Sequence, residues 1–277
     1  MVPTSSVRVV KTPTFPSRNR AQGITRNVLG VQDKTLLRSE AQDLTNRRVF
    51  LSSAVFSSTV FVWRQVPSEA ALPTAYDTFA KDYDSLNDGT GAKLLGLEDL
   101  RRLLLAQASG DVLECGVGTG LNLPLYNPAN VKSISAIDLS EGMLSQASIR
   151  AAELPLRSRL TLQQGNVESL PFENESFDTV VDTFSLCVYP DPLAALMSMR
   201  RVVRSGGRIL LLEHNRSPNG VLGAYQDLTA QPVAKMSKGC VYNQDVRSLV
   251  QQAGLEVVTI KPALGGLIQA VEARKVL

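Results

Sequence analysis

From about residue 72 onwards, the sequence alternates short apolar, β-rich runs with segments of helical periodicity. This alternation predicts parallel strands whose connecting helices cover both faces of one sheet. We expect seven strands, at residues 111–115, 133–138, 160–163, 179–182, 208–212, 257–260 and 267–271. No internal repeat or low-complexity segment interrupts the pattern. Residues 71–277 are therefore predicted to form one doubly wound, mostly parallel α/β domain.

Capping residues predict where several helices begin and end. Ser140 is expected to cap the helix that follows the second strand. Asp191, followed by a proline, is expected to cap a helix that runs to about Arg204. The run Ser205-Gly206-Gly207 is expected to end that helix before the next strand, and Asn243 is expected to cap a later helix.

A turn containing three glycines follows the first predicted strand directly. Gly116, Gly118 and Gly120 are separated by single residues. Glycine is needed where the backbone approaches a ligand closely or adopts positive φ. In doubly wound sheets, ligands bind at the carboxyl ends of the strands, beside the topological switch point. A dinucleotide fingerprint would require glycine at Leu121 or Leu123, and no Walker-type Gly-Lys-Ser/Thr follows, so both of these phosphate-binding loops are disfavoured.

Two acidic residues accompany this turn. Asp138 ends the second predicted strand, 22 residues after Gly116. A carboxylate at that place can accept hydrogen bonds from both ribose hydroxyls of an adenosyl group. Glu114 precedes the glycines, where its carboxylate can orient the turn or reach a ligand's ammonium group through water. Together, the turn and Asp138 predict a site for an adenosyl-containing ligand.

At this point the chain resembles the class I S-adenosylmethionine-dependent methyltransferases, from about Tyr76 to Ala273. The matching motifs stand in the family's order: Glu-Cys-Gly-Val-Gly-Thr-Gly at 114–120, Asp-Leu-Ser at 138–140 with Met-Leu at 143–144, Gly-Asn-Val-Glu-Ser-Leu-Pro-Phe at 165–172, Ser-Phe-Asp at 176–178 and Arg-Val-Val-Arg-Ser-Gly-Gly at 201–207. Within the class, the chain is most similar to the small-molecule branch of quinone, phospholipid and thiol methyltransferases. Segments 213–216 and 238–240 look closest to the thiol methyltransferases and their mitochondrial relatives.

The resemblance implies a Rossmann-like methyltransferase fold, S-adenosylmethionine as the cofactor and methyl transfer as the activity. Carried over position by position, it implies these contacts: the methionine moiety with Gly116, Gly118 and Gly120, the ribose with Asp138, and the adenine with Leu139, Met143, Asn166 and Val167. The family usually has Asp where Asn166 stands. An Asn side-chain oxygen can still accept a hydrogen bond from the adenine amino group.

Four residues are predicted to line the substrate pocket, and one is predicted to act as a base. Phe184 and Ser185 follow the fourth strand, where the sulfonium is expected, whereas Cys187 is interpreted as a packed small side chain. Tyr76 and Tyr83 resemble the lid helix of quinone methyltransferases, and the alternative is an amphipathic helix packed on the domain. His214 follows the fifth strand and is the chain's single histidine, so it is the candidate general base, with a structural histidine as the alternative.

Composition limits the other partners. Residues 218–244 lack regular periodicity, and their mixture of apolar and aromatic side chains favours a small lipophilic acceptor over a large polymer. After residue 70 the chain carries 19 basic and 22 acidic residues, so its charge does not favour nucleic acid. Three cysteines without paired spacing argue against a disulfide scaffold. A single histidine excludes a His-rich metal cage, and no metal is expected.

The N-terminus is interpreted as an address. Residues 1–48 are predicted to be a disordered transit peptide, because residues 1–32 contain five basic and seven hydroxyl residues but no acid. Residues 49–70 are predicted to be an apolar signal or anchor segment, with possible membrane association through the uncharged stretch 49–63 left open. Fifteen helical residues span about 22 Å, short of a hydrocarbon core of about 30 Å.

Arg47-Arg48 before an apolar stretch resembles a twin-arginine export signal. The order predicts a chloroplast protein associated with the thylakoid. The competing interpretation is a mitochondrial presequence followed by a short inner-membrane anchor. A basic tail without a targeting role and a buried helix of the domain are further alternatives. Cleavage of this segment and the oligomeric state stay open.

The sequence therefore predicts an organellar S-adenosylmethionine-dependent methyltransferase that acts on a small, lipophilic acceptor. A non-catalytic cofactor-binding factor, for assembly or structure at an organellar membrane, is the alternative, because His214 is the one convincing base. An NAD-dependent oxidoreductase is disfavoured by Leu121 in the glycine turn. The identity of the acceptor and of its methylated atom stays open.

Overall fold

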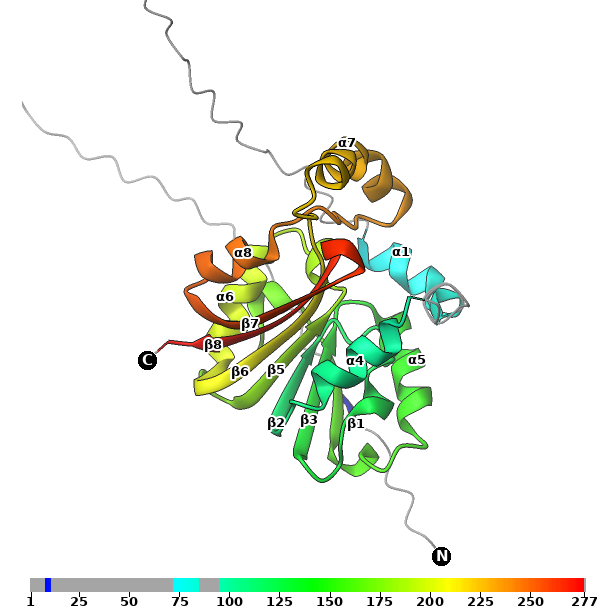
Figure 1. Ribbon diagram of the computed structural model, residues 1–277. Coiled ribbons are helices and arrows are strands. Elements are labelled where there is room, and N and C mark those ends of the chain that lie inside the picture. The colour runs from blue at the N-terminus through cyan, green and yellow to red at the C-terminus, as the bar shows by residue number, and fades with distance from the viewer. Residues whose placement is uncertain (1–7, 11–71, 85–94, 277) are drawn as a thin grey trace, which may run out of the picture. The chain divides into compact units, whose positions relative to one another are not determined.

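The computed structural model describes residues 8–10, 72–84 and 95–276. In these residues one eight-stranded sheet forms, with the order β1-β4-β3-β2-β5-β6-β8-β7 (Figure 1). The strands are β1 (Arg8–Val10), β2 (Gly110–Cys115), β3 (Val131–Asp138), β4 (Leu160–Gln164), β5 (Phe177–Thr183), β6 (Val203–His214), β7 (Leu255–Ala263) and β8 (Ile268–Lys275). Strand β8 is antiparallel to both β6 and β7, and the other pairs are parallel. The chain order reverses between β2 and β5, which makes their carboxyl ends the switch point.

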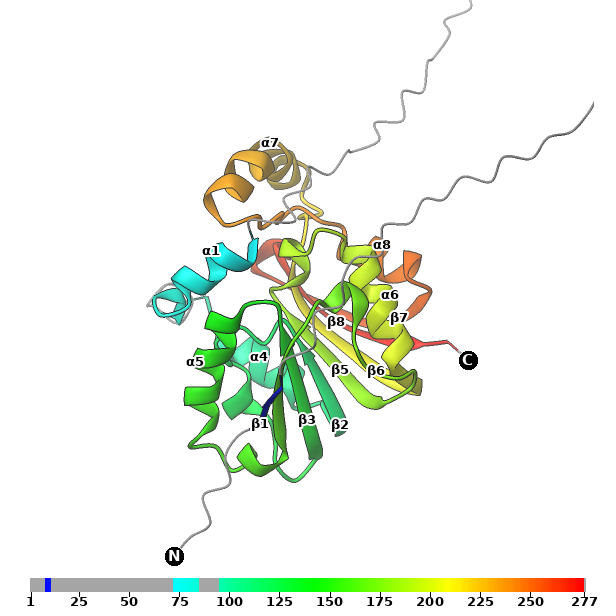
Figure 2. The same ribbon diagram turned by 180° about the vertical axis from the view of Figure 1, so that it is seen from behind.

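Helices cover both faces of this sheet. These helices are α4 (Leu97–Leu105), α5 (Glu141–Ala151), α6 (Pro192–Val202) and α8 (Val246–Gln252). Two further helices, α1 (Leu72–Phe79) and α7 (Gly220–Met236), lie at one end of the sheet. Helices α4 and α6 lie on opposite faces, as the two views in Figures 1 and 2 show. Two apolar clusters fill the layers: α6 and α8 pack in one, and α4 and α5 pack in the other.

Neighbouring strand residues divide between the two clusters because side chains alternate across a sheet. In β5, Val180 belongs to the cluster under α6 and Val181 to the cluster under α4. All strands in the middle of the sheet are therefore apolar on both faces, as expected for a sheet covered on both sides. The seven predicted strands of residues 71–277 are confirmed as β2 to β8.

The junction between α6 and β6 differs from the prediction. The helix ends at Val202 and the strand begins at Val203, so Ser205-Gly206-Gly207 lie inside the strand rather than at the end of the helix. Val203 is buried and pairs with Phe177, whereas Arg208 pairs with Thr179. The pairing therefore accommodates extra residues as a bulge, which glycine favours.

Two of the three predicted helix caps are confirmed. Ser140 Oγ accepts a hydrogen bond from the Met143 amide at 3.1 Å, and Asp191 caps α6. The cap of α8 is Asp245 rather than Asn243, because the Asp245 carboxylate accepts from the Ser248 amide at 3.0 Å. The Asn243 side chain instead donates to Asp227 of α7.

Segment 218–244, interpreted as irregular, contains the 17-residue helix α7. Its apolar residues lie on the exposed face: Val221, Tyr225, Leu228 and Met236 are 84%, 60%, 80% and 87% exposed. Sequence periodicity predicts helices that bury an apolar face in the core, and the apolar residues of α7 do not face the core.

The short strand β1 pairs in parallel with β4, with Arg8 opposite Thr161. It lies in the segment interpreted as a transit peptide, and the sequence pattern did not predict it. The remainder of the predicted targeting region, including Arg47-Arg48 and the apolar segment 49–63, lies outside the described residues. Within the part of the chain that the structure describes, none of the helices has the length and apolar character needed to span a membrane.

Candidate functional site

A cavity of about 350 Å³ opens at the carboxyl ends of the strands around the switch point. Seven of its lining residues were predicted to bind the cofactor: Gly116, Gly118, Asp138, Leu139, Met143, Asn166 and Val167. The four predicted pocket residues Tyr76, Tyr83, Phe184 and Ser185 also line it. Glu114, Gly120 and His214 do not. Cavities of this size commonly hold small-molecule ligands.

The glycine turn forms one wall of the cavity. Gly116 and Gly118 adopt φ of +57° and +55°, a conformation that favours glycine. A Cβ atom on Gly116 would lie 2.3 Å from Ser185 Oγ, so the turn approaches the end of β5 closely. The Gly118 position has no neighbour nearer than 4.0 Å and faces open space. A side chain at Gly118 would therefore occupy space at the cavity wall.

Asp138 connects this turn to the next helix. Its Oδ2 accepts a hydrogen bond from the Gly118 amide at 2.8 Å, and its Oδ1 accepts one from the Ser140 amide at 2.9 Å. Burial raises the pKa of Asp138, although hydrogen bonds from the backbone amides of Ser140, Gly118 and Leu139 oppose this shift. A carboxylate has about four acceptor positions, so Asp138 keeps acceptor capacity for a ribose hydroxyl. These residues therefore fit the ribose and methionine portions of S-adenosylmethionine.

The adenine end of the predicted site has an apolar character. Met143 is buried, whereas Leu139 is 44% exposed at the cavity rim. Asn166 caps the short helical turn Val167–Ser169, and its Oδ1 accepts from the Glu168 amide at 2.9 Å. A carbonyl oxygen has a second lone pair, so this cap leaves one acceptor position for an adenine amino group. The individual cofactor contacts stay predictions.

Helix α1 lies over the cavity and is held by an acid that sequence reasoning missed. The Asp77 carboxylate accepts hydrogen bonds from Ser140 Oγ and from the Gly142 amide, the latter at 2.9 Å. A Cβ atom on Gly142 would lie 2.7 Å from the Asp77 carbonyl oxygen, so α1 approaches α5 at a glycine. Tyr76 is thereby held against the cavity.

A second missed acid holds the other end of this lid. The Asp84 carboxylate pairs with Arg150 of α5 at 2.6 Å and accepts from Thr119 Oγ1 in the glycine turn. Arg150 also donates to the Thr119 carbonyl oxygen at 2.6 Å. Asp84 therefore ties the segment that carries Tyr83 to the cofactor loop. The sequence signal for these contacts is the presence of an acidic residue, Asp77 or Asp84, near each end of the predicted lid segment.

The two lid tyrosines keep their protons at neutral pH. Burial raises the pKa of Tyr83 to about 12 and raises that of Tyr76 further above its ordinary value. Each hydroxyl can therefore donate a hydrogen bond to a ligand.

A buried acidic pair lies beneath the β5 side of the cavity. Asp182 and Glu213 are 0% and 1% exposed and lie at the carboxyl ends of neighbouring strands. Burial raises the pKa of Asp182 to about 6, and burial beside Asp182 raises the pKa of Glu213 well above its ordinary range. Tyr189 Oη, in the cavity wall, donates to Asp182 at 2.8 Å. Two carboxyl groups that interact in a buried place disfavour each other's ionisation. Sequence reasoning did not identify this pair.

Glu114 and Gly120 lie behind the cofactor wall. Glu114 is buried and accepts from the Asn122 amide group at 3.0 Å, and burial raises its pKa to about 7. Because Asn122 follows the glycine turn, this contact favours the turn-orienting role of Glu114 over ligand contact. A Cβ atom on Gly120 would lie 2.8 Å from Leu123, so Gly120 serves close packing.

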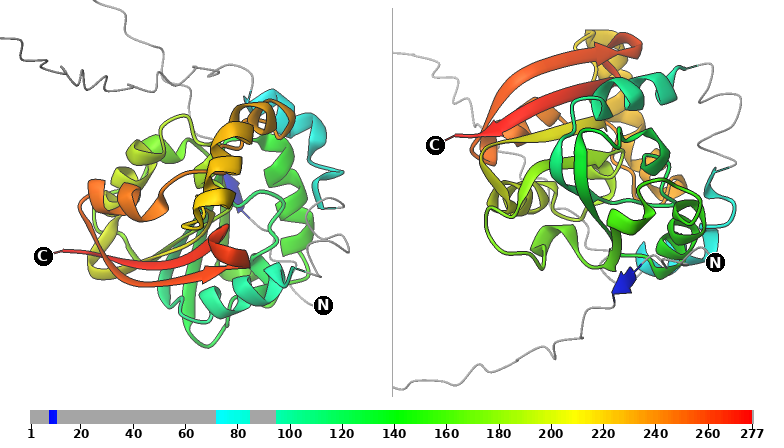
Figure 3. Two further views of the ribbon diagram at one scale, coloured as in Figure 1. Left: turned by 45° about the horizontal axis from the view of Figure 1, so that its top comes forward. Right: turned by 90° about the horizontal axis from the view of Figure 1, so that it is seen from below.

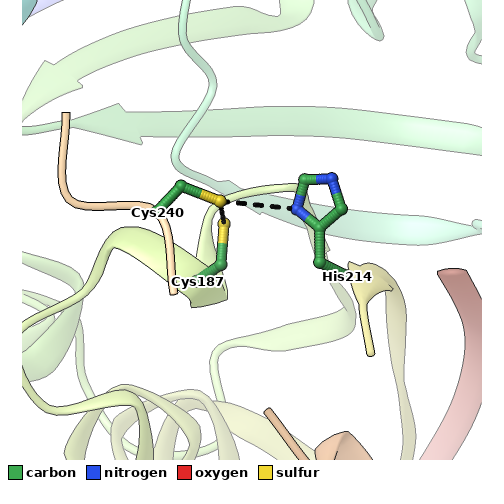
Figure 4. A group of neighbouring side chains, drawn as sticks. All are labelled: Cys187, His214 and Cys240. Atoms are coloured by element: carbon green, nitrogen blue, oxygen red, sulfur yellow. Dashed lines mark hydrogen bonds between the residues drawn. The ribbon is translucent and has the colours of Figure 1, made fainter. Parts of the chain in front are cut away.

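His214 lies one side chain away from the cavity. Its ring centroid is 5.1 Å from that of Phe184, a lining residue whose own φ is +57°. His214 Nδ1 is 3.7 Å from Cys240 Sγ, which is 3.1 Å from Cys187 Sγ (Figure 4). Cys187 is buried, as predicted, but it contacts a second thiol. Cys187 and His214 lower the pKa of Cys240 to about 5. The base role of His214 stays a prediction.

Comparison with known proteins agrees with this geometry. A family model described as a methyltransferase domain matches residues 113–211. A phosphatidylethanolamine N-methyltransferase of Cereibacter sphaeroides is 38% identical over 122 residues, which cover 44% of this chain and 59% of that protein. The mitochondrial methyltransferase OMS1 of Saccharomyces cerevisiae is 28% identical over 215 residues, covering 72% of this chain and 45% of that protein. The chain thus spans about half the length of these two relatives.

The fold is also similar to that of solved methyltransferase structures. A solved S-adenosylmethionine-dependent methyltransferase of Thermotoga maritima, described as a possible histamine N-methyltransferase, matches with a TM-score of 0.56 and 22% identity, covering 74% of this chain and 99% of that one. The matched family domain, the strand order and the glycine turn that meets Asp138 agree with the sequence resemblance. The cofactor of this family is S-adenosylmethionine. The chain therefore contains a methyltransferase domain at residues 113–211, and it is similar to the class I S-adenosylmethionine-dependent methyltransferases.

Proposed function

We propose that this protein transfers a methyl group from S-adenosylmethionine to a nucleophilic atom of a small, lipophilic acceptor. The observation that carries the proposal is that one cavity is lined by the glycine turn, Asp138, the lid tyrosines and Phe184 together. The first two fit the cofactor, and the others lie where an acceptor would approach it.

The cofactor, when bound, supplies an electrophilic methyl group on a sulfonium, so the protein has no need to create the electrophile. Asp138 and the glycine turn hold and orient it. Tyr76 and Tyr83 cover the cavity and exclude water. Alignment and water exclusion of this kind are worth several kcal/mol of a reaction barrier.

Proton removal from the acceptor has few candidate groups. Among the residues that line the cavity, Asp138 and Glu168 are the carboxylates, and Asp138 is already occupied by two backbone amides. The lid tyrosines are protonated and therefore serve as hydrogen-bond donors. His214 would need Phe184 to move before it could reach the acceptor. We therefore favour an acceptor that is nucleophilic without a strong protein base.

A lipophilic acceptor is supported by helix α7. Its exposed apolar residues Val221, Tyr225, Leu228 and Met236 are spaced so that they share one helix face. Helices α1 and α7 lie side by side at the cavity end of the sheet (Figure 3). Exposed apolar surface of this kind often marks a site for lipid or protein contact. The name of the bacterial relative, a phosphatidylethanolamine N-methyltransferase, points the same way.

The proposed compartment is an organelle. The yeast relative is named as a mitochondrial protein, which favours the mitochondrial alternative over the chloroplast and its thylakoid. A fluorescent fusion of residues 1–70 is expected to label mitochondria, and a protein that starts at Ala71 is expected to stay in the cytosol. Plastid labelling would restore the first prediction, and a cytosolic 1–70 fusion would contradict both organellar predictions.

The activity test uses the full chain with methyl-labelled S-adenosylmethionine. Phosphatidylethanolamine vesicles and a demethylated quinone serve as separate acceptors, and an organelle lipid extract serves as the mixed one. We expect label in an extractable lipophilic product, with the Asp138→Ala variant as the inactive control. Tight binding of S-adenosylmethionine without transfer to any of the three would support the non-catalytic alternative, which no feature of the site favours at present.

A further inference from the structure

The chain's single histidine and two of its three cysteines meet at one point of the fold. Cys187 lies in the helical turn Leu186–Val188 after β5, His214 ends β6, and Cys240 lies between α7 and α8. Their Sγ and imidazole nitrogen atoms all lie within 4.8 Å of one another. Figure 4 shows the imidazole edge and both sulfur atoms turned toward one another. The proposed methyl transfer uses none of the three.

The separations suit a tetrahedral metal ion. Zinc binds thiolate sulfur at about 2.3 Å and imidazole nitrogen at about 2.0–2.1 Å, so its ligand atoms lie about 3.5–3.8 Å apart. Cys240 Sγ is 3.1 Å from Cys187 Sγ and 3.7 Å from His214 Nδ1. Small side-chain rotations would therefore bring all three atoms around one ion.

The backbone holds the three ligands together without an ion. The Val241 amide, next to Cys240, donates to the Cys187 carbonyl oxygen at 2.8 Å. The Gln244 side chain donates to the Leu186 carbonyl oxygen at 3.4 Å. The loop that carries Cys240 is thus attached to the turn that carries Cys187. Such preorganisation lowers the entropic cost of binding an ion.

The donor types select the class of ion. Two thiolates and one imidazole favour a borderline or soft cation, whereas Ca²⁺ and Mg²⁺ prefer oxygen ligands. Two thiolates also neutralise a divalent charge, which matters where Cys187 is buried and the other two residues are half-buried. Three protein ligands leave the fourth tetrahedral position open.

We propose that Cys187, His214 and Cys240 bind one zinc ion, with the fourth position open. This site would fix the loop of Cys240 behind the lid, since Lys238 of the same loop lies over the ring of Phe79 in α1. A metal bound at Nδ1 makes His214 a ligand and removes that nitrogen as a base. The inference does not depend on the proposed methyl transfer.

A disulfide between Cys187 and Cys240 is the competing reading of the same contact. It would require an S–S distance of about 2.05 Å and loss of both thiol protons with two electrons to an external oxidant. It would also leave the imidazole, whose Nδ1 contacts Cys240, without a role. The convergence of a third ligand favours the metal.

The test measures metal binding by the full chain, reduced and then freed of reductant. Zinc content is measured by elemental analysis, and cobalt substitution by absorption. We expect about one ion per chain, thiolate-to-cobalt charge transfer and the visible bands of tetrahedral cobalt. Cys187→Ala, Cys240→Ala and His214→Asn should each weaken binding at least about tenfold. Cys115→Ala is the matched control, because this third cysteine lies in β2 away from the cluster, and it should bind as the unmodified chain does.

A measurement on the unmodified chain guards against variants that fail to fold. Added zinc should raise the melting temperature with concentration, and a chelator should reverse the rise, since a ligand of the folded state stabilises it. Absence of stoichiometric zinc or cobalt would overturn the proposal. So would equal loss of metal in Cys115→Ala, or a chain isolated two mass units light with a Cys187–Cys240 cross-linked peptide.

Discussion

On the cofactor side of the cavity, the contacts run through backbone amides: Gly118 and Ser140 both donate to Asp138. On the side of β5 and β6, the contacts run between buried side chains that titrate. Asp182 and Glu213 form one such group. The first arrangement needs a short stretch of chain in a fixed conformation. The second needs separate strands to be placed correctly. The two sides should therefore respond differently to substitution and to pH.

The largest effect is expected on the cofactor side. Asp138→Ala removes the carboxylate that is predicted to accept hydrogen bonds from two ribose hydroxyls. Hydrogen bonds to a charged group are worth roughly 1.5–3 kcal/mol each, so the affinity for S-adenosylhomocysteine should fall at least about 100-fold. Calorimetry measures this fall. Asp99→Ala, at an exposed position of α4, is the control and should bind normally. If the two folded variants bind S-adenosylhomocysteine with equal affinity, the predicted contact between the ribose and Asp138 is wrong.

The next effect is a pH dependence that belongs to the β5–β6 side. The pKa of Asp182 is about 6 in the folded protein, above its ordinary value of 3.8. A raised carboxyl pKa stabilises the folded state at low pH, and this contribution is lost as the pH rises from about 4 to about 6. Asp182→Asn should therefore flatten the dependence of the free energy of unfolding on pH across that window.

Denaturant unfolding at pH 4, 5, 6 and 7 measures this difference. Asp178→Asn is the matched control, because Asp178 lies on the same strand and Arg204 beside it lowers its pKa, so its stability contribution has the opposite sign. A parallel pH profile for Asp182→Asn and the unmodified chain would mean that the pKa of Asp182 is not raised in the folded protein.

A smaller effect separates backbone strain from ligand contact. Gly118→Ala forces a side chain into positive φ, which costs about 1–2 kcal/mol, and fills space at the cavity wall. Cofactor affinity should fall about tenfold or more. Gly206→Ala is the control: its φ is +75° and it also faces open space, but it lies in β6. Both variants should lose similar stability, measured by unfolding, and only Gly118→Ala should lose affinity.

The smallest effect concerns the lid. Asp84→Asn weakens the ion pair with Arg150, whose partners are 34% and 27% exposed. Partly exposed pairs contribute about 0.2–1 kcal/mol, so cofactor affinity should fall about two- to fivefold. Glu98→Gln breaks the more exposed pair with Arg102 on α4 and should leave affinity unchanged. An unchanged Asp84→Asn would show that the lid does not depend on this contact.

The cofactor half of the site followed from the sequence because its parts are local. A glycine turn directly after a strand and an acid at the end of the next strand must meet when two neighbouring strands are parallel. Short local sequence patterns likewise predicted the strands and the caps Ser140 and Asp191. Such a pattern did not predict the junction after α6, because the pairing of Val203 with Phe177 outweighed the helix-ending tendency of the following glycines.

What only the tertiary structure decided lies on the other half. The sequence did not predict helix α7, because its apolar residues are exposed and give no core-facing pattern. Cys187, His214 and Cys240 show no ligand spacing along the chain, and a single histidine argued against a metal. They meet because β5 and β6 are neighbours in the sheet and a backbone hydrogen bond from Val241 holds the Cys240 loop against the turn after β5. The sequence alone determines contacts such as that of the glycine turn with Asp138, because a regular strand pairing fixes the distance between them. The contacts among Cys187, His214 and Cys240 join three separate segments of the chain, so they depend on how the whole sheet packs.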